Sequence, residues 1–186
     1  LCNSSIDDEG LKLLVEGTAN HFNIAKLDLA RNELITSAGL KSLSSLLQCE
    51  YCYLEILALW GINFCDEMAS ALADGLKGNT SVRHLYFDVA SRTALGWEAF
   101  ARLVCDTSSI NHTYLSNHTL QTVGNYFSYS APEDMRRKLD LNSEGRTYAT
   151  ICKILKSHRE FEIDPMFTWK LKLLPLVVAW FSEARL

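Results

Sequence analysis

A pattern of apolar residues that recurs every 28 to 30 positions constrains the fold of this chain more than any other feature. Its clearest copy runs from Ile24 to Leu47. The first half of this copy has the spacing L-x-x-L-x-L-x-x-N-x-L, which predicts a short strand and a chain reversal. In the second half, Leu40, Leu43 and Leu47 are spaced i, i+3 and i+7, which predicts a helix with one apolar face. Elements this short bury little surface alone, so we expect neighbouring copies to stack on each other.

Three more copies follow the first. Their strands are predicted to begin at Leu54, Val82 and Ile110, which gives separations of 30, 28 and 28 residues. The copy at Ile110 is degenerate, as terminal repeats usually are. A partial copy without its strand precedes Ile24, so we expect the chain to be a fragment that lacks further repeats at its N-terminus.

Proline and glycine divide the chain into two parts. All three prolines lie after residue 131, whereas eight of the nine glycines lie at or before Gly124. We therefore predict an array of four to five repeats over residues 1–127 and an α-helical C-terminal capping region over residues 128–186. Within the cap, composition and apolar spacing predict helices over residues 130–141 and 144–158, and a third that begins at Asp164.

The repeat pattern resembles leucine-rich repeats of the ribonuclease-inhibitor kind over residues 1–127. The resemblance implies an α/β solenoid with a curved parallel sheet on its concave face and helices on its convex face. It also implies a non-catalytic scaffold for protein–protein interaction, with a protein partner bound on the concave face. One branch of the family stimulates GTP hydrolysis, so a regulator of a small GTPase is the alternative, although the acidic tail of that branch is absent here.

Side chains alternate along a strand, so the residues between the inward leucines should point to the open face of the sheet. Aromatic and histidine side chains in neighbouring rows would form an amphipathic surface suited to a partner. The residues that we expect to form this surface are Lys26, Asp28, Ile56, Trp60, His84, Tyr86, Asp88, His112 and Tyr114. The competing explanation is that aromatic residues simply suit a pleated sheet.

Charge and motifs argue against several other functions. The chain has a net charge of -4 and no dense basic stripe, which disfavours nucleic acid. It contains no common motif of a hydrolase, metalloprotease or nucleotide-binding enzyme, so we predict no catalysis, no cofactor and no small-molecule substrate. A hydrolytic enzyme that uses His84 or His112 with Asp88 is a further alternative. The longest apolar run, residues 173–181, is too short to span a membrane.

The cysteines and asparagines each allow two interpretations. Six irregularly spaced cysteines favour free thiols in a reducing, cytoplasmic compartment, although a secreted protein stays possible. The pair Cys49 and Cys52 would need a second ligand pair to bind zinc, so we predict no metal site. Four asparagines begin N-x-S/T triplets, which suit turns between helix and strand but could also be glycosylated in a secreted chain. They are Asn3, Asn79, Asn111 and Asn117.

Overall fold

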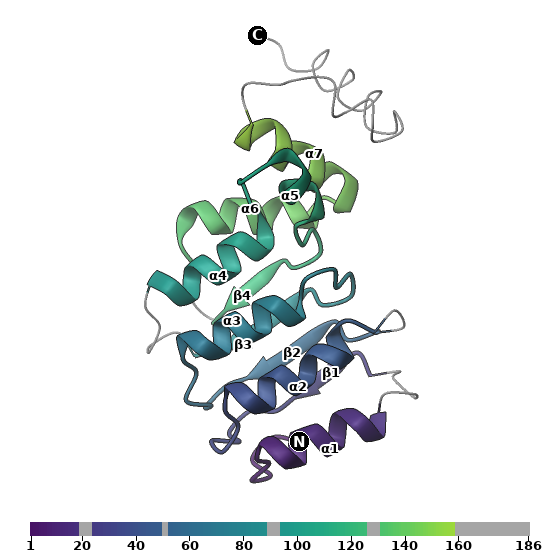
Figure 1. The fold of residues 1–186 in the computed structure, drawn as a ribbon, viewed down its shortest axis with the longest axis vertical. Coiled ribbons are helices and arrows are strands. Elements are labelled where there is room, and N and C mark those ends of the chain that lie inside the picture. The colour runs from purple at the N-terminus through teal and green to yellow at the C-terminus, as the bar shows by residue number, and fades with distance from the viewer. Residues whose placement is uncertain (19–23, 50–51, 89–93, 126–130, 159–186) are drawn as a thin grey trace.

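The fold alternates strands and helices. The computed structural model describes residues 1–18, 24–49, 52–88, 94–125 and 131–158 (Figure 1). In these residues it contains α1 (Asp8–Thr18), β1 (Lys26–Asp28), α2 (Ser37–Leu47), β2 (Ile56–Leu59), α3 (Asp66–Gly75), β3 (His84–Phe87), α4 (Ala94–Val104), α5 (Ile110–Leu115), β4 (Thr122–Gly124), α6 (Glu133–Ser143) and α7 (Arg146–Ser157). The predicted α/β class is confirmed.

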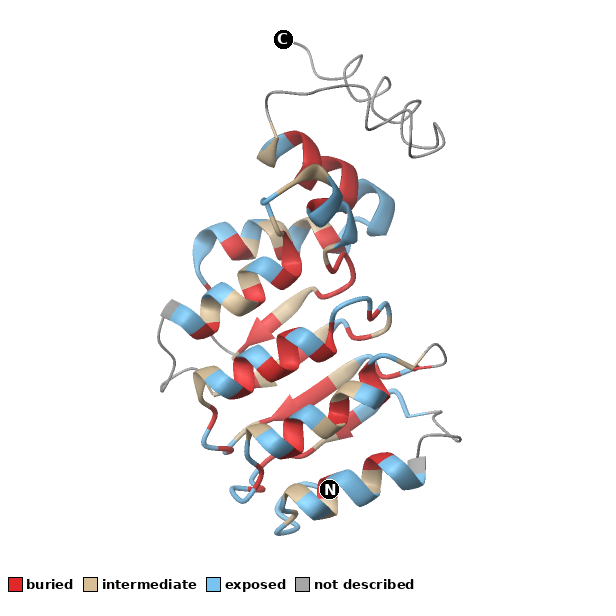
Figure 2. Ribbon diagram, in the orientation of Figure 1, coloured by how far each residue is buried: buried red, intermediate tan, exposed pale blue. Residues whose placement is uncertain are grey.

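The four strands form one parallel sheet in the order β1-β2-β3-β4. Leu27, Leu57, Leu85 and Val123 lie opposite one another across the four strands, and all are buried. Helices α1, α2, α3, α4 and α6 lie in a row in front of the sheet (Figure 1), and buried residues line the helices and the strands behind them (Figure 2). The inward direction predicted for these leucines is therefore confirmed, and the core lies between the sheet and the helices.

Aromatic rings link the sheet to the helices at the centre of this core. The ring of Phe87 in β3 stacks on that of Phe64, with centroids 4.5 Å apart, and on that of Phe100 in α4, with centroids 5.5 Å apart. All three side chains are at most 1% exposed. Stacked aromatic pairs add about 0.5–1.5 kcal/mol to the gain from burial, so this cluster joins β3 to α4 and to the loop before α3.

Gly39 and the hydrogen bonds between Thr36 and Asp8 bring α1 and α2 close together. Thr36 caps α2, because its hydroxyl accepts a hydrogen bond from the backbone N–H of Ala38. The same threonine donates from its backbone N–H and its hydroxyl to the carboxylate of Asp8 in α1, at 2.7 and 2.6 Å. A Cβ at Gly39 would clash with Oδ1 of Asp8, so a larger residue there would push this carboxylate away from Thr36.

Buried asparagines hold the loops at the strand ends. Asn32 follows β1 and is fully buried. Its Oδ1 accepts hydrogen bonds from the backbone N–H groups of Ser4 and Ile6, and its Nδ2 donates to the carbonyl of Leu29. This side chain therefore supplies partners to backbone groups that no strand or helix satisfies.

A second kind of buried asparagine precedes β3 and β4. Nδ2 of Asn79 donates to the carbonyl of Leu47 at the end of α2, and its Oδ1 accepts from the backbone N–H of Val82. Asn117 makes the corresponding contacts one strand further on, with the carbonyl of Leu76 and the backbone N–H of Leu120. Each side chain therefore ties the end of an earlier helix, α2 for Asn79 and α3 for Asn117, to the segment that leads into the next strand.

The predicted strand at Ile110 is wrong, because this segment is the short helix α5. The hydroxyl of Ser109 accepts a hydrogen bond from the backbone N–H of His112, which begins the helix. Oγ1 of Thr113 donates back to the carbonyl of Asp106, and it closes the turn inside the protein. The strand that pairs with β3 comes later, with Thr122 opposite His84.

The helices expected over residues 130–141 and 144–158 are confirmed as α6 and α7, which pack against each other. Helix α6 also contacts α4, and α7 contacts α5. The boundary proposed at residues 127 and 128 stays a prediction. The helix predicted from Asp164 lies outside the described residues.

Candidate protein-binding face

The side chains that alternate with the buried leucines lie on the face of the sheet opposite the helices. Across the strands, Lys26 lies opposite Ile56, and Ile56 opposite His84. One row further on, Asp28 lies opposite Ala58, and Ala58 opposite Tyr86. Trp60 and Asp88 directly follow β2 and β3. We call the seven sequence-predicted residues on these strands the sheet face: Lys26, Asp28, Ile56, Trp60, His84, Tyr86 and Asp88.

Three rings on the sheet face stack in a row, which we call the aromatic ladder. The centroids of Trp60 and Tyr86 are 5.6 Å apart, with 11° between the ring planes. Those of His84 and Tyr86 are 6.0 Å apart, with 6° between the planes. All three residues are partly exposed. Each ring therefore packs against its neighbour in a near-parallel arrangement.

Two carboxylates flank the aromatic ladder in fixed positions. Oδ2 of Asp88 accepts a hydrogen bond of 2.7 Å from the backbone N–H of Gly61, a residue with a φ of +64°. Oδ1 of Asp28 accepts one of 3.1 Å from the backbone N–H of Ala30. Lys26 lies exposed at the β1 side of the same face. The face therefore combines flat rings with charged groups of both signs at its margin.

His84 forms the polar end of the ladder. Its Nδ1 lies 3.2 Å from Oγ1 of Thr122 on β4. Burial, followed by the nearby charge of Arg83, lowers the pKa of His84 below its ordinary value of 6.5. The ring is therefore neutral at pH 7, and it can stack and hydrogen-bond without carrying charge.

His112 and Tyr114 do not lie on the sheet face, so this part of the prediction is wrong. Both residues belong to α5, and the Nδ1 of His112 lies 2.8 Å from the hydroxyl of Ser109 in the same helix. Tyr114 is 42% exposed. Their predicted place on the sheet face depended on a strand at Ile110. A helix takes the place of that strand, so both residues lie elsewhere.

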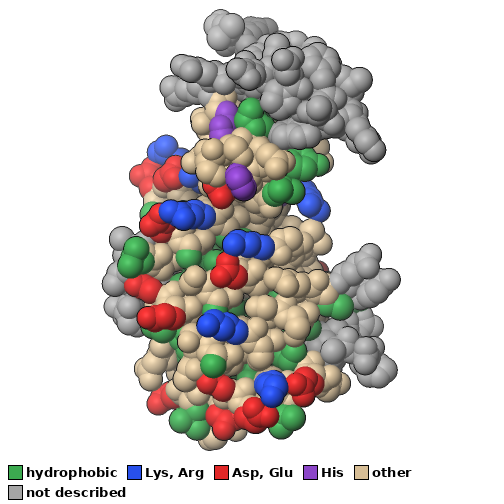
Figure 3. Space-filling view, in the orientation of Figure 1, with side chains coloured by type: hydrophobic (Ala, Val, Ile, Leu, Met, Phe, Trp, Pro, Cys, Tyr) green, Lys and Arg blue, Asp and Glu red, His purple; other side chains and the backbone are tan. Residues whose placement is uncertain are grey.

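The helix-covered side looks different from the sheet face. Figure 3 shows acidic and basic side chains interspersed over the helices, with apolar groups scattered among them. Four ion pairs between exposed or partly exposed side chains connect neighbouring turns of one helix, including Arg102 with Glu98 and Lys138 with Asp134. Such pairs contribute little to stability and suit a surface in contact with water.

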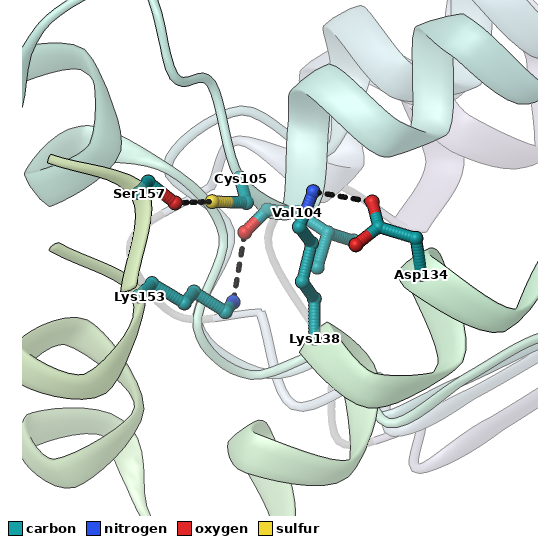
Figure 4. Close-up of polar contacts among 6 residues, drawn as sticks. All are labelled: Val104, Cys105, Asp134, Lys138, Lys153 and Ser157. Atoms are coloured by element: carbon teal, nitrogen blue, oxygen red, sulfur yellow. Dashed lines mark hydrogen bonds and ion pairs between the residues drawn. The ribbon is translucent and has the colours of Figure 1, made fainter. Parts of the chain in front are cut away.

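The sequence did not predict a buried polar centre at the C-terminal end of α4. Lys153 of α7 is 1% exposed, and its Nζ reaches four acceptors. These are the carbonyl of Val104 at 2.8 Å (Figure 4), the carbonyl of Asn117 at 3.2 Å, Nδ1 of His118 at 3.4 Å and Oδ1 of Asn142 at 2.7 Å. All four are neutral acceptors, so no carboxylate among these contacts offsets the charge of the protonated Lys153.

The pKa values of this centre follow from burial. Burial lowers the pKa of Lys153 to about 7. Burial, and then the charge of Lys153, lower the pKa of His118 to about 4. His118 is therefore neutral at pH 7, with Nε2 positioned to donate to the carbonyl of Tyr114 and Nδ1 to accept from Lys153.

The structure bears on the two interpretations of the cysteines and of the N-x-S/T triplets. The six cysteines are free thiols, and no group of three or more potential metal ligands occurs within the described ranges. Asn79 and Asn117 are buried and use both ends of their amides, which supports the turn interpretation of these two triplets. Asn3 and Asn111 are exposed.

None of the described helices combines the length and the apolar content that a bilayer crossing requires. No protein-family model matches the chain, and no significant match to a curated protein was found.

Proposed function

We propose that the chain is part of a leucine-rich-repeat solenoid of the ribonuclease-inhibitor kind, and that it acts as a non-catalytic scaffold for a protein partner. The spacing of β1, β2 and β3, with residues 26, 56 and 84 in register, supports this proposal. So does the row of helices on one side of the sheet (Figure 1). In such an architecture the partner binds the sheet face.

The aromatic ladder is the observation that carries the proposal. Trp60 and Tyr86 lie on the face that the row of helices leaves uncovered, with their rings already parallel. Tryptophan and tyrosine offer large contact areas and lose few rotatable bonds when they bind, so they dominate many protein interfaces. Asp28 and Asp88 beside them can accept hydrogen bonds from the partner.

We expect Tyr86→Ala to abolish capture of a partner while the chain stays folded. The substitution removes two stacking contacts, which should cost about 1–3 kcal/mol of stability together. An interface that loses a central tyrosine weakens by about 2 kcal/mol or more, which is at least a 30-fold change in affinity. The measurement is a pull-down from a lysate with the immobilised chain, alongside thermal unfolding of the same variant.

Tyr53→Ala is the matched control, since Tyr53 is 57% exposed and precedes β2 outside the sheet face. A protein that the wild type and the control capture equally, and that Tyr86→Ala and Trp60→Ala lose, supports the proposal. If all four chains capture the same proteins, or if Tyr53→Ala loses them too, the aromatic ladder does not bind the partner.

A further inference from the structure

A pocket of about 620 Å³ lies between α6 and α7, beside the end of α4. This volume is in the range of small-molecule sites. Helix α6 contributes side chains to one wall and α7 to another, and Cys105 directly after α4 adjoins both. The charged residues of the lining are Asp134, Arg137, Lys138, Lys153 and Lys156.

The lining is strongly basic although the whole chain has a net charge of -4. Four basic side chains face a single carboxylate, that of Asp134, which pairs with Lys138 at 2.7 Å. Arg137 pairs with Glu133 outside the lining. Lys156 is exposed, and no carboxylate of the described residues pairs with it. The pocket therefore has an excess of positive charge.

Lys153 adds a buried cation to one wall of the pocket. Its Nζ contacts only neutral acceptors, as described above, and lies beside Cys105 and Lys138 (Figure 4). A buried charge without a counter-ion is costly, and an anion nearby would offset this cost. The hydroxyl of Ser157, which also lines the pocket 3.6 Å from Sγ of Cys105, offers a neutral donor.

We propose that this pocket binds a small phosphorylated molecule, with Arg137, Lys138 and Lys156 in contact with its phosphate oxygens. Guanidinium and ammonium groups are the usual partners of phosphate in proteins. The N–H groups of Lys153 are all used by its four acceptors. Its charge therefore attracts the phosphate from the wall of the pocket, without a direct hydrogen bond. This site is separate from the sheet face and does not depend on the function proposed for it.

The test is a calorimetric titration of the full chain with pyrophosphate and with glycerol 3-phosphate at low ionic strength, and with glycerol as the uncharged comparison. The pocket variant carries three substitutions: Arg137→Gln, Lys138→Gln and Lys156→Gln. The matched control carries Lys12→Gln, Lys41→Gln and Lys77→Gln on and after the first three helices. Each variant removes three charges and two surface ion pairs, so both change the net charge by the same amount.

We expect the wild type to bind both phosphate compounds with a Kd of about 1 mM or tighter, and we expect no binding of glycerol. The pocket variant should bind about ten-fold more weakly, whereas the control should stay within about two-fold of the wild type. Binding should also raise the pKa of Lys153, measured by NMR from the shift of its ε-carbon. The absence of binding, an equal loss in both variants, or a Lys153 signal that saturating ligand leaves unchanged would each overturn the proposal.

Discussion

Asn117→Ala is expected to lower the free energy of unfolding by about 4 kcal/mol, because alanine would leave several buried backbone groups without partners. In the wild type, Nδ2 of Asn117 donates to the carbonyls of Leu76 and Asn79, at 3.2 and 3.1 Å. Its Oδ1 accepts from the backbone N–H groups of Thr119 and Leu120, both at 2.9 Å. Each orphaned group costs about 1–3 kcal/mol, and relaxation of the loop keeps the sum below the maximum.

Urea unfolding at neutral pH measures this loss. The matched control is Asn111→Ala, because Asn111 begins the same kind of N-x-T triplet but lies exposed on α5. Its substitution should change the free energy of unfolding by no more than about 0.5 kcal/mol. If the two variants were equally stable, Asn117 would not connect the end of α3 to the start of β4.

The strands β1 to β3 could be predicted from sequence because their apolar alternation and their spacing agree. Leu27, Leu57 and Leu85 each fill the same place between sheet and helices, and a shift by one residue would expose them to water. The direction of every intervening side chain follows from this register. For this reason the positions of these seven residues on or beside the strands follow from the sequence, whereas their role in binding stays a prediction.

The strand after β3 could not be predicted in the same way. Residues 110–115 keep an apolar residue at each end, which fits the strand pattern, but Ser109 and Thr113 supply the side-chain contacts of a short helix. Packing of α5 against α7, which is distant in sequence, favours the helix over the strand. The spacing of the apolar residues does not indicate that a helix is inserted between β3 and β4.

The buried polar centre was hidden for a related reason. The apolar spacing that predicts α7 consists of Tyr148, Ile151, Cys152 and Leu155; the last three are buried, whereas Tyr148 is 49% exposed. Lys153 lies between them and would be assigned to solvent, because lysine is rarely buried. Its burial depends on acceptors from three distant segments, the carbonyls of Val104 and Asn117 and the amide of Asn142. No local sequence signal indicates that these acceptors converge.

Lys153→Met is expected to remove a large pH dependence of stability. In the wild type the pKa of Lys153 is about 7 in the folded state, against an ordinary value of about 10.4 in the unfolded chain. Between these two values the unfolded state binds more protons than the folded state, so the stability of the wild type rises with pH. Below pH 7 both states are protonated, and the cost of burying the charge is fully present and constant.

Methionine has no titratable group, so the Lys153→Met variant lacks this rise of stability with pH. The stability of the wild type relative to the variant should rise by up to about 1.4 kcal/mol per pH unit above pH 7, and by roughly 5 kcal/mol over the whole span. Urea unfolding of both chains at pH 6, 7.5 and 9 measures the difference, in which the titration of other groups largely cancels. Two parallel stability curves would mean that Lys153 keeps an ordinary pKa in the folded protein.

His118 reports on the same charge from inside the protein. Burial is the main cause of its pKa of about 4, and the charge of Lys153 is the second cause. In Lys153→Met the charge is gone but the burial stays, so the pKa of His118 should rise while remaining below its ordinary value of 6.5. NMR titration of its ring measures this change directly. A pKa that stays near 4 in the variant would show that burial alone keeps His118 neutral, and that Lys153 does not act on it through charge.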